Sequence, residues 1–130
     1  MSNDPAKFSL NEKFSVKARL KSFVYAWAGI IRFFRTEHNA QIHLAVTIVV
    51  IFLSFLLKIN KTETVAVVFS IAFVWVTEMI NTAIEKAMDF ITVERHPQIR
   101  NVKDMAAGAV LVAAIVAVVI GGIVFIPKIF

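Results

Sequence analysis

Four polar residues at helical spacing lie in a largely apolar stretch of the chain and carry its strongest chemical signal. Glu78, Asn81, Glu85 and Asp89 are three, four and four residues apart. With about 100° of rotation per residue, these positions fall within an arc of roughly 80° on one face of a helix. Three carboxylates and an amide would be costly to expose to lipid. We therefore expect this polar stripe to face protein or water.

Two other apolar stretches also begin with polar and ionisable side chains. Glu37, Asn39 and His43 open the first of them, and Lys103 and Asp104 open the last. Carboxylate and amide oxygens suit a hard cation such as Mg²⁺, which binds one or two carboxylates together with the oxygens of a phosphate. A lysine ammonium suits the phosphate itself. Together these residues predict phosphoryl transfer at a membrane surface.

The composition indicates that lipid is the solvent of these elements. The 130 residues are 58% hydrophobic and 18% charged, whereas soluble domains have about 45–50% apolar and about 25% charged residues. A soluble domain of this size buries only about 60–70% of its unfolded surface, so it could not hide the excess. The absence of cysteine excludes disulfide scaffolds, thiolate metal sites and cysteine nucleophiles. The length predicts a single domain over residues 1–130.

Three transmembrane helices are predicted in an all-α chain, at residues 37–57, 64–90 and 104–126. His38–Leu57 and Met105–Ile126 are uncharged runs of 20 and 22 residues when histidine is neutral. At about 1.5 Å per residue, each reaches roughly 30 Å, the thickness of a bilayer's hydrocarbon core. The middle run, Thr64–Thr77, is too short to span alone. It spans when it is extended past Glu78, whose carboxylate must then be sheltered.

The segment before the first span has its own helical pattern. Apolar residues recur at helical spacing, with the basic residues mostly on other faces; the apolar positions are Val16, Leu20, Phe23, Trp27, Ile30 and Phe34. This pattern is typical of an amphipathic helix in the membrane interface, predicted here at residues 15–35. A helix packed on a partner protein is the alternative. Residues 1–13 are expected to form a polar tail.

The basic residues predict the orientation in the membrane. Of the 14 Lys and Arg residues, all but Lys58, Lys61 and Lys128 precede the first span or lie at and between the second and third. Basic residues favour the cytoplasmic side, so we expect a multi-pass protein of the cytoplasmic (inner) membrane with a cytoplasmic N-terminus. The predicted site then lies at the cytoplasmic interface. No soluble basic face is evident, so nucleic acid is not an expected partner.

Three motifs resemble those of one family. The run Glu78–Lys86, EMINTAIEK, followed by Asp89, resembles the signature of the small integral-membrane prokaryotic diacylglycerol kinases, which include the undecaprenol kinases. A second match is Lys103–Leu111, KDMAAGAVL, and a third is Glu37-x-Asn39-x-x-Ile42-His43. The resemblance extends over roughly residues 15–127. The chain has no GxxxxGK[ST] or GxGxxG loop of the soluble nucleotide-binding folds.

The resemblance implies an architecture and an activity. Members of the family are homotrimers of three transmembrane helices and an N-terminal surface helix, with active sites at the cytoplasmic interface. They transfer the γ-phosphate of Mg-ATP to a lipid alcohol. ATP and Mg²⁺ are thus the expected phosphate donor and cofactor, and the membrane and a lipid alcohol are expected partners.

Carried over by motif, the resemblance also assigns roles to single residues. Glu78 would be the general base on the lipid hydroxyl, and Glu37 and Glu85 would hold Mg²⁺. The residues expected at the nucleotide and its phosphates are Lys103, Asp104, Asp89 and Glu85. Those expected to position the substrate are Asn81, Asn39 and His43.

The pattern around His43 bears on the acceptor. Glu37-x-Asn39-x-x-Ile42-His43 resembles the undecaprenol kinase branch, which slightly favours undecaprenol as the acceptor. Diacylglycerol, converted to phosphatidic acid, is the alternative.

Less specific interpretations stay open at this point. Asn81 could serve only as a hydrogen-bonding residue between helices, a common use of polar side chains in membranes. His43 could be a packing residue, and Glu85-Lys86 and Lys103-Asp104 could be interfacial anchors. A small membrane carrier could also use a carboxylate stripe, but it would need polar residues through the whole depth of the membrane. A non-catalytic membrane subunit is the remaining alternative.

Overall fold

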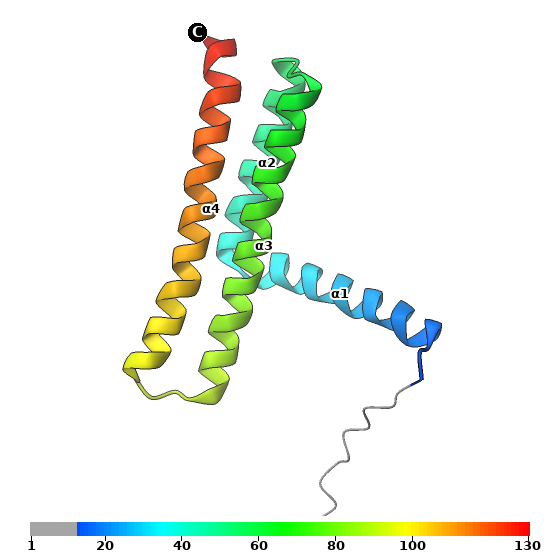
Figure 1. Ribbon diagram of the computed structural model, residues 1–130, viewed down its shortest axis with the longest axis vertical. Coiled ribbons are helices and arrows are strands. Elements are labelled where there is room, and N and C mark those ends of the chain that lie inside the picture. Colours follow the sequence, from blue (N-terminus) through cyan, green and yellow to red (C-terminus); the bar gives the residue numbers. More distant parts are fainter. Residues whose placement is uncertain (1–12) are drawn as a thin grey trace, which may run out of the picture. The chain divides into compact units, whose positions relative to one another are not determined.

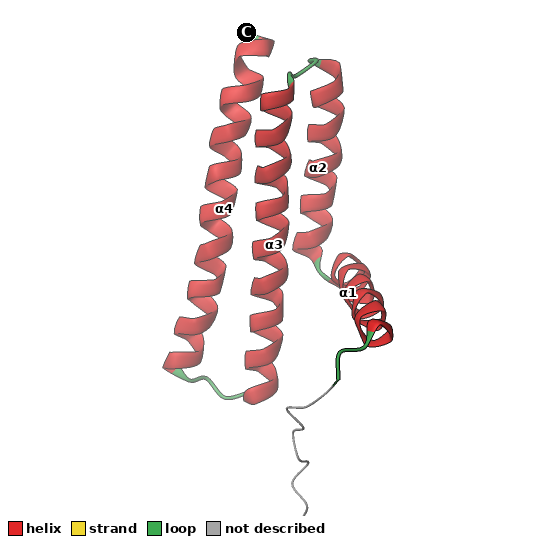
Figure 2. Cartoon of the chain, turned by 45° about the vertical axis from the view of Figure 1, so that its right-hand side comes forward, coloured by secondary structure: helices red, strands yellow, loops and turns green. Residues whose placement is uncertain are grey.

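The computed structural model describes residues 13–130, so the predicted polar tail lies almost wholly outside the described residues. The described chain is helical, without strands, which confirms the all-α prediction. Its four helices are α1 (Val16–Thr36), α2 (His38–Leu56), α3 (Lys61–Ile91) and α4 (Pro97–Ile129). α2, α3 and α4 run alternately up and down (Figure 1). α3 is the central helix of the three and packs more closely on α4 than on α2 (Figure 2).

All three helices of this bundle are long and apolar enough to cross a membrane, which confirms the predicted number of spans. α2 has 19 residues, whereas α3 has 31 and α4 has 33. At about 1.5 Å per residue, α3 and α4 are roughly 45–50 Å long, against roughly 30 Å for the hydrocarbon core. The C-terminal end of α3 and the N-terminal end of α4 extend past the start of α2 (Figure 2).

Local signals set where the helices begin. Lys58 adopts a left-handed φ of 50° in the short connection between α2 and α3. The Asn60 side chain then accepts a hydrogen bond from the Glu63 N–H at 2.9 Å, and the Glu63 carboxylate accepts one from the Asn60 N–H at 2.8 Å. This reciprocal capping box starts α3. At the other end of α3, the Gln98 N–H donates to His96 Nδ1 at 3.2 Å, so His96 caps α4 and Pro97 is its first residue.

The start of α4 has a consequence for the site. The apolar run predicts a span only from residue 104, but the helix begins seven residues earlier, at Pro97. Lys103 and Asp104 therefore lie inside a helix, whose geometry fixes their spacing, instead of at its first residue.

Polar residues are buried and large apolar residues are exposed in this bundle. The buried side chains of the described chain include Thr47, Ser70, Glu78 and Asn81. Large apolar side chains face outward, among them Phe55, Phe69 and Ile123, with 80%, 73% and 70% of their surface exposed. This is the reverse of a water-soluble domain and matches a bundle whose surroundings are lipid.

α1 occupies the region in which a surface helix is predicted. Large apolar side chains along it, among them Leu20, Phe23 and Trp27, are exposed. Its place at a membrane interface stays a prediction, as does the homotrimer.

The capping box generates a test of the fold. Asn60→Ala removes the side chain that accepts the Glu63 N–H, so we expect the free energy of unfolding to fall by about 1 kcal/mol. Circular dichroism during denaturant titration in detergent micelles measures this loss. Asn60→Ser is the control, because serine also caps helices and should recover most of it. Equal losses in both variants would contradict a capping role.

Candidate functional site

The polar stripe changes from buried to exposed along α3. Glu78 and Asn81 are buried, with 4% and 8% of their surface exposed. Glu85 is half-buried and Asp89 is exposed. Glu78 and Asp89 are eleven residues apart, which corresponds to about 16 Å at the helical rise. The stripe therefore runs from the interior of the bundle to its surroundings at one end.

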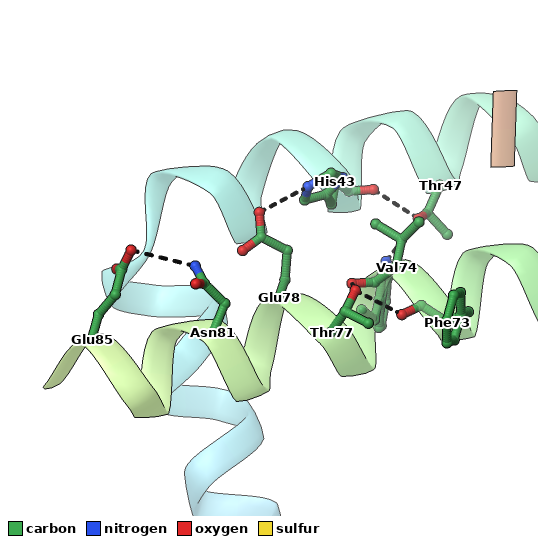
Figure 3. Close-up of polar contacts among 9 residues, drawn as sticks. His43, Thr47, Phe73, Val74, Thr77, Glu78, Asn81 and Glu85 are labelled. Atoms are coloured by element: carbon green, nitrogen blue, oxygen red, sulfur yellow. Dashed lines mark hydrogen bonds and ion pairs between the residues drawn. The ribbon is translucent and has the colours of Figure 1, made fainter. Parts of the chain in front are cut away.

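The buried end of the stripe contacts α2. Figure 3 shows Glu78 pointing from α3 toward His43, whose Nε2 lies 3.2 Å from Glu78 Oε1. Glu78 is the one buried charged side chain among residues 13–130. A His43 Nε2–H donated to Oε1 leaves the second carboxylate oxygen of Glu78 for another partner. His43 is therefore a polar partner of the deepest carboxylate and more than a packing residue.

Two residues that were not predicted as site residues, Thr47 and Trp75, connect to the backbone of His43 through hydrogen bonds. The Thr47 hydroxyl donates to the His43 carbonyl oxygen at 2.7 Å, and Trp75 Nε1 donates to the Thr47 hydroxyl at 3.1 Å. The Trp75 ring also packs edge-on against Phe34, with ring centroids 4.8 Å apart. No sequence spacing connects Thr47 on α2 with Trp75 on α3, so only the packing of the helices reveals the contact.

Asn81 presents an oxygen that has no partner. Its Nδ2 donates to Glu85 Oε1 at 3.4 Å, while its Oδ1 is buried and makes no hydrogen bond (Figure 3). A buried oxygen without a partner costs about 1–3 kcal/mol. Such an oxygen is available to a cation or a hydrogen-bond donor that enters the site.

Glu37 is brought to the same level of the bundle by Lys86. Glu37 precedes α2, and its Oε1 lies 2.7 Å from the Lys86 ammonium on α3. The hydrogen bond from Lys86, assisted by one from the Thr36 hydroxyl, holds the pKa of Glu37 below its usual value. Lys86 follows Glu85 directly, so the ion pair ties Glu37, at the start of α2, to the helical turn of α3 that carries Glu85.

The donor set fits a magnesium ion that is carried by phosphate. Within residues 13–130, no group of three or more Asp, Glu or His side chains could enclose a metal alone. Mg²⁺ needs only one or two carboxylates when phosphate oxygens and water complete its octahedron. Glu37, Glu85 and the Asn81 Oδ1 offer hard oxygen ligands of this kind.

The connection between α3 and α4 forms an open cavity of about 840 Å³. Three of the four residues that were predicted at the nucleotide and its phosphates line it, namely Asp89, Lys103 and Asp104, whereas the fourth, Glu85, does not. The Lys103 ammonium pairs with the Asp89 carboxylate, and Arg100 lies 3.8 Å from Asp104. Three further residues with basic side chains line the cavity and were not predicted as site residues: Arg95, His96 and Arg100. The basic residues of this connection could have indicated them, but these residues were interpreted only as evidence for the orientation in the membrane.

A second, apolar cavity of about 370 Å³ lies between the three bundle helices. His43 and Thr47 line it from α2, Val74 and Trp75 from α3, and Ala117 from α4. Asn39 is exposed in the first turn of α2, and its part in positioning a substrate stays a prediction.

Comparisons with known proteins match most of the chain. The sequence profile of the family described as prokaryotic diacylglycerol kinase matches residues 24–125. The undecaprenol kinase of Bacillus subtilis (strain 168) is 41% identical over 108 residues, which are 83% of this chain and 88% of that relative. A diacylglycerol kinase of Synechocystis sp. is 37% identical over 83% of this chain and 62% of its own length. A diacylglycerol kinase of Pseudomonas aeruginosa is 32% identical over 80% of this chain and 85% of its own.

The unpaired oxygen of Asn81 generates a prediction about stability. Asn81→Leu removes the buried Oδ1 that lacks a partner and loses only the long hydrogen bond of 3.4 Å from Nδ2 to Glu85, so we expect the free energy of unfolding to rise by about 1 kcal/mol. Ser70→Ala is the matched control, because the buried Ser70 hydroxyl already donates to the Val67 carbonyl at 3.0 Å, and its loss should not stabilise the protein. Denaturant titration in micelles measures both. A marked destabilisation by Asn81→Leu would contradict this expectation, because the hydrogen bonds of Asn81 would then outweigh the cost of its unpaired oxygen.

Proposed function

This chain belongs to the prokaryotic diacylglycerol kinase family and is a lipid kinase, and from this premise we propose that it transfers the γ-phosphate of Mg-ATP to undecaprenol at the cytoplasmic face of the membrane. The observation that carries the proposal is the polar stripe. One helix face joins a buried carboxylate, Glu78, to an exposed cavity lined by Lys103 and Asp89. A carrier would need polar residues at all depths, and membership of a kinase family argues against a non-catalytic subunit.

Glu78 is the proposed general base. A lipid alcohol reaches this depth when its hydrocarbon chain stays in the bilayer, and the Glu78 oxygen that His43 does not contact can accept its hydroxyl proton. The lipid oxygen forms a bond to the γ-phosphorus while the bond from that phosphorus to the bridging oxygen breaks. The products are a lipid phosphate and ADP, and the proton resides on Glu78. Phosphoryl transfer depends mainly on positioning and charge neutralisation, so few residues suffice.

The proposed ligands for Mg²⁺ and the nucleotide are the stripe residues beyond Glu78, together with Glu37 before α2 and Lys103 and Asp104 on α4. Glu37, Glu85 and Asn81 would hold Mg²⁺, which supplies positive charge that neutralises the phosphates. Lys103 would bind the phosphates as a cation, and Asp89 and Asp104 would support the nucleotide. The cavity that these three residues line supports a nucleotide site here, because it opens at the end of the bundle where the stripe is exposed.

The membrane orientation is part of the same proposal. The basic residues favour a cytoplasmic N-terminus and a cytoplasmic α3–α4 connection, which places the nucleotide cavity on the side where ATP is present. We also propose a homotrimer with α1 at the membrane surface. α2 and α4 cover the stripe on α3 only in part, because Asp89 is exposed and Glu85 half-buried.

Two observations favour undecaprenol over diacylglycerol. The relative named undecaprenol kinase is 41% identical to this chain, against 37% and 32% for the two relatives named diacylglycerol kinases. His43 follows the pattern of the undecaprenol kinase branch. The preference is modest, and diacylglycerol stays the alternative acceptor.

An assay in mixed micelles tests the activity. Purified protein receives Mg-ATP labelled in its γ-phosphate and either undecaprenol or diacylglycerol. We expect label on undecaprenol at a higher kcat/KM than on diacylglycerol. A reversed ratio would reassign the acceptor, and label on neither lipid would contradict the proposed activity.

Glu78→Gln tests the base. The amide cannot accept the hydroxyl proton, so kcat should fall by about 10²–10⁴-fold. Glu63→Gln is the matched control on the same helix, since glutamine can also complete the capping box and activity should persist. Size-exclusion chromatography shows whether both variants assemble. Wild-type activity in Glu78→Gln would remove Glu78 from this role.

A further inference from the structure

Two polar contacts join α2 to α3 one helical turn apart. His43 Nε2 meets Glu78 Oε1 at 3.2 Å, and Thr47 Oγ1 accepts the Trp75 indole N–H at 3.1 Å. His43 and Thr47 are four residues apart on α2, and Trp75 and Glu78 are three apart on α3, which is the spacing of neighbours on one helix face. α3 packs less closely on α2 than on α4. Polar contacts therefore have a strong influence on how α2 is aligned with α3.

The Thr47 hydroxyl both donates and accepts a hydrogen bond in this arrangement. It donates its one proton to the His43 carbonyl oxygen at 2.7 Å and accepts from Trp75. Thr47 is buried, with 8% of its surface exposed. Phe34 packs edge-on against the Trp75 ring and restricts its motion. The indole on α3 is thus connected through Thr47 to the backbone of the residue that contacts Glu78.

We propose that Trp75 and Thr47 are positioning residues, which hold His43 against one oxygen of Glu78 and leave the other oxygen for the acceptor hydroxyl. The inference rests on the proposed function, in which Glu78 takes the proton. Trp75 and Thr47 act through His43 and not on the substrate. Such an indirect role can be large, because a misplacement of about 1 Å at a reacting group can cost about 100-fold in rate.

Matched variants test the role in catalysis. Thr47→Val removes the hydroxyl and keeps the shape, and Trp75→Phe removes the N–H and keeps an aromatic ring. We expect each to lower kcat at least about tenfold. KM for ATP should not change, because the nucleotide cavity lies at another level of the bundle. The double variant should be no slower than the slower single variant, since both break the same connection.

Two further variants separate the hydrogen bond from general damage. Thr47→Ser keeps the hydroxyl and should recover most of kcat. Ser54→Ala removes a hydroxyl from the same helix that donates to the Val50 carbonyl at 2.7 Å, as Thr47 does to that of His43, and it should leave kcat unchanged. Should Thr47→Val fail to assemble, Trp75→Phe tests the same bond from the other side.

A spectroscopic readout tests the contact without catalysis. Trp27→Phe leaves Trp75 as the remaining tryptophan of the 2 in the chain. In that background, Thr47→Val should shift the ultraviolet resonance Raman band that reports indole N–H hydrogen bonding. Thr47→Ser and Ser54→Ala should not shift it.

The outcomes distinguish this inference from the proposed function. A wild-type kcat in Thr47→Val, an unshifted Raman band, or additive losses with a raised KM for ATP would each overturn the positioning role. Full activity in Glu78→Gln would overturn it together with the proposed base, even where the Raman shift still showed the contact.

Discussion

The burial of the Glu78 carboxylate inside a lipid-surrounded bundle is the constraint on which the rest of the structure depends. An isolated charge in such surroundings is unstable, so a polar partner must stand at the same depth. His43 on α2 provides it. Because α2 is too apolar to offer many such groups, its alignment with α3 is restricted to registers in which His43 reaches Glu78.

The two interfaces of α3 differ because only the one with α2 provides the polar partner of the buried Glu78 carboxylate. Toward α2, polar pairs such as Trp75 with Thr47 accompany the packing. Toward α4, closer packing accompanies small side chains, and Ala113 is fully buried. Small residues let helix backbones approach closely where no hydrophobic force holds helices together in lipid. α3 and α4 therefore form the more extensive pair, whereas specific hydrogen bonds align α2.

The sequence predicts what depends on helix geometry and not what depends on packing. The shared face of Glu78 and Asn81 follows from the helical period, and both are buried as that face requires. The partners of these residues were not predictable, because His43 and Glu78 are 35 residues apart and only the alignment of α2 with α3 pairs them. The length of an apolar run reflects the thickness of the membrane, and a helix can extend beyond that run. The early start of α4 at Pro97 therefore depends on a local signal, the cap formed by His96.

Because α3 is continuous from Glu78 to Asp89, it fixes the distance between the buried end and the exposed end of the polar stripe. A rigid helix fixes the separation of its side chains along its axis, here about 16 Å. Under the proposed function, with Glu78 as the base, the protein sets the depth of the acceptor hydroxyl, and that depth is the same for every acceptor. Discrimination between lipid alcohols would then arise from how their hydrocarbon chains hold the hydroxyl at that depth. Chain shape, more than headgroup chemistry, would then separate a polyprenol from a diacylglycerol.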